Sequence, residues 1–488
     1  MVAFSSTPVN LALSVASAVL LVLIFPGFNF TYLGPVAIAP LLMACAREAS
    51  WKRRFLNGWA AGFVFWIGVC HWIQFILQAH GGLSVWLSWV SLLLFAVLKG
   101  LHLAIFSALV GRLMPKWFAI PAVAALWTGV ERTHGPLGFP WLDLGNAGID
   151  MPSVMRLAPL VGVYGLSFVF AMLGCAIALV ALRRPRRELL WLLLLLPAVL
   201  PGLPRLPRQA PNELVRVVQP NIDTEAEWTA RTLASTERDM AALSRAPGVP
   251  LVVWPEAPAP FYPDDLSFQD NLKRVTRGED AHLLFVGVAH TAAGEPLNSS
   301  FFADPSGALL GRYDQIKLVP FGEYVPAPFG WVNRITKETS DFVPGDRVVT
   351  FAFNDHRIAP VICYESAFPD LVRQFPLAGA EMLFNLSNDG YFGTSMAARQ
   401  QHLALARMRA AENRRWVLFA TNDGITAMID PAGRITERLA PYRQLGATMK
   451  YGFVNETTPY TRHGDWFAWA CLILAFLMLA LPVKRVSD

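Results

Sequence analysis

Long apolar stretches fill most of the first two hundred residues of the chain and return near its C-terminal end. A helix needs roughly 17–25 apolar residues to cross a bilayer, and most of these stretches reach or approach that length. We therefore expect an α-helical transmembrane bundle of about eight spans, with about seven helices before residue 204. The stretches cover, approximately, residues 9–27, 32–46, 57–78, 84–111, 117–131, 158–182, 189–204 and 466–483.

Beyond about residue 205 the pattern changes to short apolar runs separated by turns and amphipathic segments. A proline-rich stretch marks the change, and strands interleaved with helices predict a layered α/β domain. Strands are expected over 214–219, 249–254, 282–288, 300–303, 311–319, 348–353, 357–362, 382–385, 416–421 and 425–429, and helices over 224–246, 264–277, 366–375 and 396–414. The predicted parts are a transmembrane bundle (1–204), an extramembrane domain (205–465), and a C-terminal transmembrane helix with a short tail (466–488).

Composition and charge support a membrane protein with a defined orientation. The chain is 54% hydrophobic and 16% charged, with a mean hydropathy of +0.39, which is too apolar for an ordinary soluble protein. Basic residues gather in alternate gaps between the spans, at 47–54, 112–116, 183–187 and 484–485. By the positive-inside rule both termini are expected in the cytoplasm and the 205–465 region outside it. Because the basic residues face the cytoplasm, no nucleic-acid partner is expected, and the sequence has neither a glycine-rich phosphate loop nor a metal-ligand cluster.

Three polar residues, His71, Lys99 and His102, lie inside the predicted spans. Polar groups in lipid are costly and often functional. No carboxylate lies at helical spacing from them, so packing, snorkelling or a polar lining is the favoured interpretation.

Cys363 differs from the other four cysteines, which all lie in long apolar segments where a thiol behaves as a small hydrophobe. It follows a strand-like run and precedes a segment that can start a helix. Helix N–H groups at such a turn are expected to lower the pKa of the thiol. A buried structural thiol is the alternative.

Two further predicted strand ends carry side chains that could take part in catalysis. Glu256 leaves the apolar run LVVWPE, and burial there would raise the pKa of its carboxyl and suit it to act as a general base. A solvated turn residue is the plainer interpretation. The second predicted strand end begins the run from Tyr313 to Pro326, which contains several polar and charged residues.

Four motifs follow one another in the second half of the chain: W-P-E, Y-x-x-x-x-L-V-P-F-G-E-Y-V-P, I-C-Y-E and S-N-D-G-Y-F-G. In this order they resemble the nitrilase superfamily of carbon–nitrogen hydrolases. Joined to a membrane bundle and a C-terminal span, they resemble the apolipoprotein N-acyltransferases. This resemblance covers essentially the whole chain. It implies an αββα sandwich with a Glu-Lys-Cys triad, on the periplasmic side of a multi-pass bacterial inner-membrane protein.

The resemblance also implies the reaction and its partners. Such enzymes move a fatty acyl chain from a phospholipid to the α-amino group of a diacylglyceryl-cysteine at the N-terminus of an apolipoprotein. Cys363 would attack the phospholipid ester and carry the chain as a thioester, with Glu256 taking its proton. The backbone N–H of Tyr364 would stabilise the oxyanion. A monomer without a cofactor or metal is expected.

Further positions match family motifs more loosely. Glu323 and Glu365 resemble carboxylates near the nucleophile, with salt bridges to arginines as the alternative. Asn388 is expected to hydrogen-bond the active-site loop, or to be a plain turn residue. Trp228 and Asn298 are weaker matches.

The chain departs from the family pattern at Gln315, which occupies the position of the catalytic lysine, while a lysine occurs at Lys317. If 313–319 is a strand, both side chains point to one face, about 6.7 Å apart, and Lys317 is a candidate substitute lysine. Otherwise Gln315 is an inactivating change, natural or engineered. Loss of one preorganised donor costs on the order of 10²–10³ in rate. We favour the second account.

Aromatic loops flank the predicted strand ends at 257–263, 324–331 and 390–393. Exposed aromatic groups suit a bilayer interface. We expect a lid over the acyl chain, or alternatively anchors in the domain's own core. The lid or interface residues would be Phe329, Trp331, Tyr391 and Phe392.

Two rival functions remain open from sequence. A membrane-anchored carbon–nitrogen hydrolase would use the same triad with water as the acceptor. A catalytically impaired lipid- or lipoprotein-binding form would follow from Gln315. A transporter is disfavoured because charges inside the spans are sparse.

Overall fold

The computed structural model describes residues 7–135, 139–196, 210–224, 226–256, 259–325 and 342–482. The chain divides into two compact units. The first, here called the membrane unit, comprises 1–74, 85–206 and 463–488. The second, the sheet unit, comprises 207–462 together with the short segment 75–84. That segment comes from within the N-terminal half of the sequence.

The described residues of the membrane unit form helices joined by turns and loops, and none of them forms a strand. Its α-helices are α1 (Thr7–Leu23), α2 (Ala39–Arg47), α3 (Trp51–Cys70), α5 (Val85–Val110), α6 (Ala119–Arg132), α7 (Pro152–Met155), α8 (Ala158–Ala181) and α16 (Trp466–Ala480), with 3₁₀ segments η1 (Thr31–Val36), η2 (Leu144–Gly148) and η3 (Arg186–Leu195). α4 (Ile73–Ala79) leads from this unit into the sheet unit.

Within the described residues, two helices are long and apolar enough to cross a membrane, α5 and α8. The pair α3 and α4 passes the same test together, with a bend of 58° between the two helices. Three shorter apolar helices cover Pro8–Leu23, Thr31–Arg47 and Trp466–Ala480. Apolar helices are therefore present, but the predicted count of eight spans is not confirmed. The predicted span at 189–204 is 3₁₀ helix up to Leu195, and its end lies outside the described residues.

Glycine lets α3 and α5 approach closely. A Cβ atom placed on Gly62 would lie 2.6 Å from the Cα atom of Gly100 on the facing helix. Helix association in lipid depends on close packing, because helix surfaces and lipid tails are equally apolar. Small residues at a crossing allow this close packing. The sequence Gly58-x-x-x-Gly62 thus positions α3 against α5.

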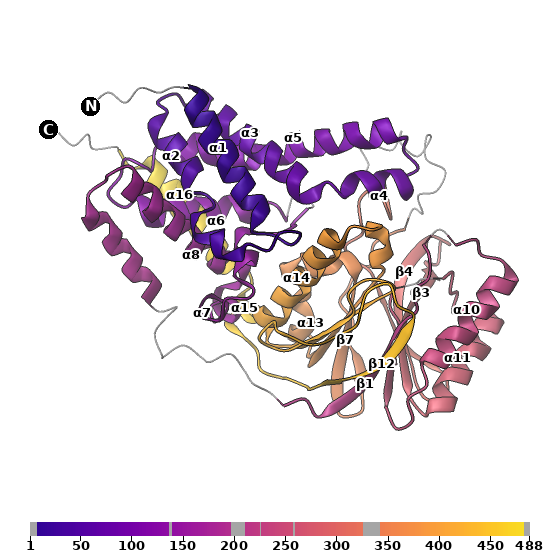
Figure 1. The fold of residues 1–488 in the computed structure, drawn as a ribbon. Coiled ribbons are helices and arrows are strands. Elements are labelled where there is room, and N and C mark those ends of the chain that lie inside the picture. The colour runs from indigo at the N-terminus through magenta and orange to yellow at the C-terminus, as the bar shows by residue number, and fades with distance from the viewer. Residues whose placement is uncertain are drawn as a thin grey trace. The chain divides into compact units, whose positions relative to one another are not determined.

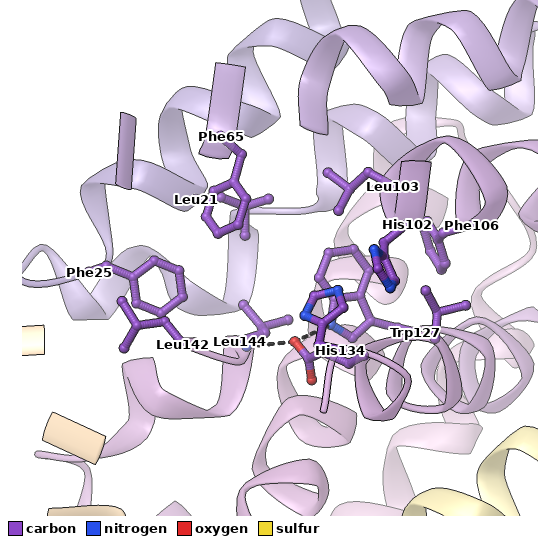
Figure 2. Close-up of a pocket in the computed structure, with 12 residues that line it drawn as sticks. Leu21, Phe25, Phe65, His102, Leu103, Phe106, Trp127, His134, Leu142 and Leu144 are labelled. Atoms are coloured by element: carbon purple, nitrogen blue, oxygen red, sulfur yellow. Dashed lines mark hydrogen bonds between the residues drawn. The ribbon is translucent and has the colours of Figure 1, made fainter. Parts of the chain in front are cut away.

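A small pocket, with a cavity volume of about 30 Å³, lies inside the membrane unit (Figure 2). Its apolar wall includes Phe25 and Phe65, and its polar lining is His102, Glu131 and His134, with the two imidazole rings edge to face at 4.1 Å. The polar lining predicted for His102 is therefore confirmed.

Lys99, another polar residue of the predicted spans, also has partners inside this unit. Its ammonium donates to the Phe139 carbonyl over 3.1 Å and lies 4.9 Å from the centre of the Trp66 ring. Packing and a carbonyl partner therefore accommodate this charge, as the sequence predicted.

The sheet unit contains two six-stranded sheets. The first has the order β12-β1-β2-β3-β4-β5 and the second β11-β10-β9-β8-β7-β6. The strands are β1 (Glu213–Gln219), β2 (Leu251–Val253), β3 (His282–His290), β4 (Pro296–Ala303), β5 (Leu309–Asp314), β6 (Phe351–Phe353), β7 (His356–Ile362), β8 (Met382–Ser387), β9 (Trp416–Thr421), β10 (Ala427–Ile429), β11 (Ile435–Arg438) and β12 (Leu445–Tyr451). Strands β1 to β3 and strands β7 to β9 are parallel, and the others pair antiparallel.

Helices cover the outer faces of both sheets in Figure 1, with α10 and α11 on one side and α13 and α14 on the other. Aromatic side chains such as Phe268 on α11 and Phe285 on β3 fill the core under the first pair. Between the sheets, Phe302 stacks on Phe351 at 5.4 Å. The helical elements are α10 (Ala230–Leu243), α11 (Leu266–Glu279), η6 (Cys363–Ala367), α12 (Pro369–Val372), α13 (Gln374–Leu377), η7 (Asp389–Phe392), α14 (Met396–Asn413) and α15 (Pro459–His463). The predicted αββα sandwich is confirmed.

The predicted elements of this unit are all present, but with shifted ends. β5 ends at Asp314, not at residue 319, and the predicted helix over 366–375 is three short pieces. Pro369 is the first residue of α12, and Pro376 lies within α13. Proline has no backbone N–H to donate, so it interrupts a continuous helix. Two strands, β11 and β12, were not predicted, because their sequences ITER and LGATMKY are not continuous apolar runs.

Candidate active site

Cys363 lies directly after β7, at the first residue of η6, so the predicted strand-to-helix turn is confirmed. Its backbone is left-handed, with φ of +45°, a conformation that costs energy for a residue with a Cβ atom. The Cys363 carbonyl accepts hydrogen bonds from His402 Nε2 at 3.0 Å and from Asn385 Nδ2 at 3.3 Å. Two side chains from other elements thus hold the turn in place.

Glu256 follows β2 in the first sheet, and its carboxyl is close enough to the Cys363 thiol of the second sheet for the two groups to interact electrostatically. Its Oε2 accepts the backbone N–H of Asn388 over 2.9 Å, and its Oε1 accepts Nδ2 of Asn298 over 2.9 Å. Both β2 and β7 belong to parallel runs, and the site gathers at the carboxyl ends of these strands, where α/β sheets usually bind ligands.

Gln315 fills a buried slot between Asn298 and Glu323. Its Oε1 accepts from Asn298 Nδ2 at 2.7 Å, and its Nε2 donates to Glu323 Oε2 at 3.1 Å and to the Lys317 carbonyl at 3.0 Å. Asn298 Nδ2 also lies 3.1 Å from Oε1 of Glu323. Amide groups therefore connect the two carboxyls of Glu256 and Glu323 in the place where the family pattern has an ammonium.

Glu365 joins the ends of the two sheets. It accepts the Tyr313 hydroxyl at 2.6 Å and the backbone N–H of Ile316 at 2.7 Å, both at the end of β5. Its other oxygen accepts the N–H of Ile362 at 2.8 Å, at the end of β7. The carboxyl is fully buried, and it fixes the chain on either side of the nucleophile.

Burial dominates the electrostatics of the carboxyls and the thiol at this site. Burial raises the pKa of Glu256, and it raises the pKa of Glu365 to about 7. Burial and the nearby carboxyl of Glu256 raise the pKa of Glu323 to about 8. The direction expected for Glu256 is thus confirmed.

The expectation for the nucleophile is wrong. Burial and then the charge of Glu256 raise the pKa of the Cys363 thiol well above its ordinary value, although Ser387 donates a hydrogen bond to the sulfur. η6 has five residues, which is short for a helix-dipole effect, and carboxyls surround the thiol. The resting cysteine is therefore expected to be a thiol rather than a thiolate.

Lys317 lies apart from the amide network of the site. Its ammonium is 5.3 Å from the centre of the Phe368 ring, and its backbone N–H donates to Glu365 over 3.3 Å. Because β5 ends at Asp314, Gln315 and Lys317 do not continue a strand. The alternation that would have put both side chains on one face is absent.

Other predicted residues have varied positions. Tyr364 is buried, with its ring against Phe368, and Trp228 packs against the core of the first sheet. Tyr391 stacks on the ring of His80 at 4.2 Å, and Phe392 is buried with its ring facing His402. Phe329 and Trp331 lie outside the described residues.

Sequence reasoning missed a second group of polar residues beside the nucleophile. Asp389 accepts the Ser387 hydroxyl at 2.8 Å and is 3.0 Å from Nδ1 of His402, whose Nε2 reaches the Cys363 carbonyl. The polar positions Asn385 and Ser387 in the apolar run MLFNLS were the available signal.

Known proteins resemble this chain over nearly its whole length. A family model described as the apolipoprotein N-acyltransferase N-terminal domain matches residues 17–176, and one for carbon–nitrogen hydrolases matches residues 214–448. An apolipoprotein N-acyltransferase of Geobacter metallireducens is 33% identical, with 97% of this chain and 95% of the relative aligned. The chain belongs to the apolipoprotein N-acyltransferase family. Relatives with the same description in Azotobacter vinelandii and Pseudomonas syringae pv. tomato are 35% and 32% identical, each over 98% of this chain.

Among solved structures, an amidase from Nesterenkonia sp. aligns with 52% of this chain and 94% of its own, with 17% identity and a TM-score of 0.39. The apolipoprotein N-acyltransferase family was the one that the ordered motifs resembled, so that identification is confirmed.

Proposed function

We propose that this protein transfers a fatty acyl chain from a membrane phospholipid, through a Cys363 thioester, to the α-amino group of the diacylglyceryl-cysteine of apolipoproteins. Membership of the family supports this reaction. One observation carries the assignment of roles: the Glu256 carboxyl and the Cys363 thiol interact across the carboxyl ends of β2 and β7, which belong to the two sheets. That pair is the minimum that a thioester mechanism requires.

In the first half-reaction Glu256 takes the thiol proton while the sulfur attacks the phospholipid ester carbonyl. The raised pKa of Glu256 suits a base that must later return the proton. The tetrahedral intermediate collapses as the C–O bond breaks. Glu256 then gives the proton to the leaving oxygen, so a lysophospholipid departs and the acyl chain remains on Cys363.

In the second half-reaction the neutral α-amino group attacks the thioester carbonyl, and Glu256 accepts a proton from the nitrogen. The C–S bond breaks, the amide forms, and the proton returns to the sulfur. Nothing in this cycle needs a metal or a cofactor. The Tyr364 backbone N–H is assigned to the oxyanion.

Gln315 makes this chain a slow member of its family. Its amide N–H groups already donate to Glu323 and to the Lys317 carbonyl, and they carry no charge to stabilise a thiolate or an oxyanion. Because the Lys317 ammonium lies over the Phe368 ring, we do not assign it the role of the missing lysine. Asn298, Glu323 and Glu365 act as groups that position the base and the nucleophile.

The membrane arrangement follows from the charge pattern of the sequence. We assign the protein to the bacterial inner membrane as a monomer with about eight spans. The sheet unit would be periplasmic and both termini cytoplasmic, as the basic residues between the spans indicate. Both substrates are membrane lipids, which gives a physical reason to tether an acyltransferase to the bilayer.

Intact mass spectrometry of the purified protein tests the thioester. After incubation with phospholipid, one acyl mass should appear on the native chain and be absent from Cys363→Ser. Addition of a diacylglyceryl-cysteine peptide should then move that mass to the peptide. No acyl adduct at any time would contradict the proposal and favour the lipid-binding alternative.

The same experiment separates the hydrolase alternative. A membrane-anchored carbon–nitrogen hydrolase would release free fatty acid to water, and added peptide would not change the products. A diacylglyceryl peptide that gains the acyl chain at its amine excludes that outcome.

A further inference from the structure

His402 on α14 lies between two groups that only accept hydrogen bonds. Its Nδ1 is 3.0 Å from Oδ1 of Asp389, and its Nε2 is 3.0 Å from the carbonyl oxygen of Cys363. A neutral imidazole has one N–H and one lone pair, and only imidazolium donates from both nitrogens. A neutral ring would therefore turn a lone pair toward one of these oxygens.

The proton count of the pair follows from these contacts. Both hydrogen bonds form only if the histidine and the aspartate together hold one proton more than neutral imidazole plus carboxylate. That proton belongs on the ring, because an imidazole is normally a stronger base than a carboxylate. Asp389 already accepts the Ser387 hydroxyl on the same oxygen, which further favours the carboxylate.

The surroundings make this ion pair an enclosed one. His402 and Asp389 are both fully buried, and the rings of Phe392 and Phe419 lie in T-shaped contact with the imidazole. Breaking one side of a buried charge pair is strongly unfavourable, because it leaves the other charge unpaired. Such a pair keeps its position and can therefore hold an adjacent backbone segment in a strained conformation.

That neighbour is the nucleophile, whose backbone has φ of +45°. We propose that protonated His402, paired with Asp389, is a positioning pair that holds the Cys363 carbonyl and thereby aims the sulfur at Glu256. The pair touches the main chain of the nucleophile and not the reacting sulfur, so its role is to position. Ser387 links it to the thiol, since the same hydroxyl contacts Asp389 and the sulfur.

The proposal predicts an upper pH limit for the ordered turn at Cys363, set by the His402–Asp389 pair. When the ring loses its second proton, one of the two hydrogen bonds becomes a repulsive contact, and the turn relaxes. Other titratable groups face the pair: Glu256 acts electrostatically on His402, and Arg399, one turn earlier on α14 and paired with Asp423, acts on Asp389. Their contributions are common to all variants below.

The test measures alkylation of Cys363 by iodoacetamide against pH in the full-length protein in detergent. This readout needs no acyl transfer, so the inference, which takes Cys363 as the nucleophile of the proposed function, can fail separately from it. In the unmodified protein, ¹⁵N NMR of labelled histidine should show one ring that keeps both protons at neutral pH. A neutral His402 tautomer would overturn the proposal without any variant.

Two substitutions separate positioning from a general structural role. Asp389→Asn removes the anion, so the imidazolium should lose its proton at lower pH and the alkylation profile should shift to lower pH. His402→Gln removes the imidazole, so the pH dependence that belongs to the pair should vanish from the alkylation profile, and the alkylation rate should fall on the order of 10²-fold, the cost of a small misplacement. His356→Gln is the matched control, because His356 pairs with Glu381 at the opposite end of β7. Equal losses at every pH, with an unshifted profile, would contradict the proposal.

Discussion

The Nε2 atom of Gln315 donates a hydrogen bond of 3.1 Å to Oε2 of Glu323, and its Oε1 accepts one of 2.7 Å from Asn298. A neutral amide thus contacts Glu323 and Asn298 at the position where the family motif has a lysine. A lysine at this position reaches one atom farther than glutamine and adds a positive charge between two buried carboxyls. The consequences of that single difference can be measured.

Gln315→Lys should raise the rate of N-acylation by about 10²–10³-fold, the usual value of one preorganised charged donor. The ammonium would also lower the pKa of the Cys363 thiol, because an opposite charge favours the thiolate. The measurement is transfer of acyl mass to a diacylglyceryl peptide. Gln315→Met, of similar size without polar atoms, is the control and should not gain activity.

The alternative role of Lys317 predicts a different result. If its ammonium served the site, Lys317→Met would remove the remaining activity, and Gln315→Lys would add little. Because the ammonium lies over the Phe368 ring, we expect Lys317→Met to change the rate by less than Gln315→Lys does. The reverse order would restore Lys317 as the catalytic cation.

Glu256→Gln should lower the rate of thioester formation by about 10²–10⁴-fold, since a general base contributes that much. The amide keeps the side-chain shape and still accepts one hydrogen bond, so the fold should persist. Acyl adduct formation on Cys363 in a time course measures the effect. Glu227→Gln, at an exposed position, is the control, and an equal fall in both variants would argue against the base.

The buried carboxyls predict how stability depends on pH. The pKa values of Glu365 and Glu323 are raised to about 7 and about 8, whereas both groups titrate near 4.5 when unperturbed. Between these limits the folded state binds more protons than the unfolded state, so the free energy of unfolding falls as pH rises. Thermal unfolding followed in detergent should therefore have its highest midpoint near pH 5 and a lower one at pH 8.

Gln315→Lys offers a check on the origin of that pH dependence. An ammonium beside Glu323 stabilises its carboxylate and lowers its pKa, so the loss of stability between pH 5 and pH 8 should become smaller. An unchanged slope would mean that groups elsewhere in the chain control it.

The sequence alone located those site residues that a local pattern identifies. Glu256 and Cys363 each follow a buried apolar strand, and the carboxyl ends of such strands are where α/β sheets usually bind ligands. The motifs therefore located both residues, although their strands belong to different sheets. The Gln315 region was harder, because β5 ends where the N–H groups of Ile316 and Lys317 turn to the Glu365 carboxylate. That contact spans about fifty residues of sequence and leaves no periodic signal.

Two other features depend on contacts that no single stretch contains. The pairing of His402 with Asp389 needs α14 and η7 to be placed beside η6, and polar residues on a mixed helix do not indicate which of them face a site. The predicted span 57–78 was read as continuous from hydropathy, but the chain bends by 58° between α3 and α4. Residues 75–84 then belong to the sheet unit.

The segment 75–84 is attached to the sheet unit by ring stacking. The imidazole of His80 and the phenol of Tyr391 are parallel within 7° at 4.2 Å, and Phe75 lies against Gly393, where a Cβ would collide with its ring. Aromatic pairs of this kind add about 0.5–1.5 kcal/mol beyond the area that they bury. The stack therefore holds the motif loop that follows Asn388, whose N–H binds Glu256.

His80→Ala should increase amide hydrogen exchange across residues 75–84, and His80→Phe should not, because phenylalanine keeps the stacked ring. Tyr391→Ala should give the same increase, and the double variant should add little to either single change, since both remove one shared contact. Hydrogen exchange with mass spectrometry in detergent measures all four proteins. Additive effects of the two alanine substitutions would show that His80 and Tyr391 act independently, and the stack would then not explain why this segment folds with the sheets.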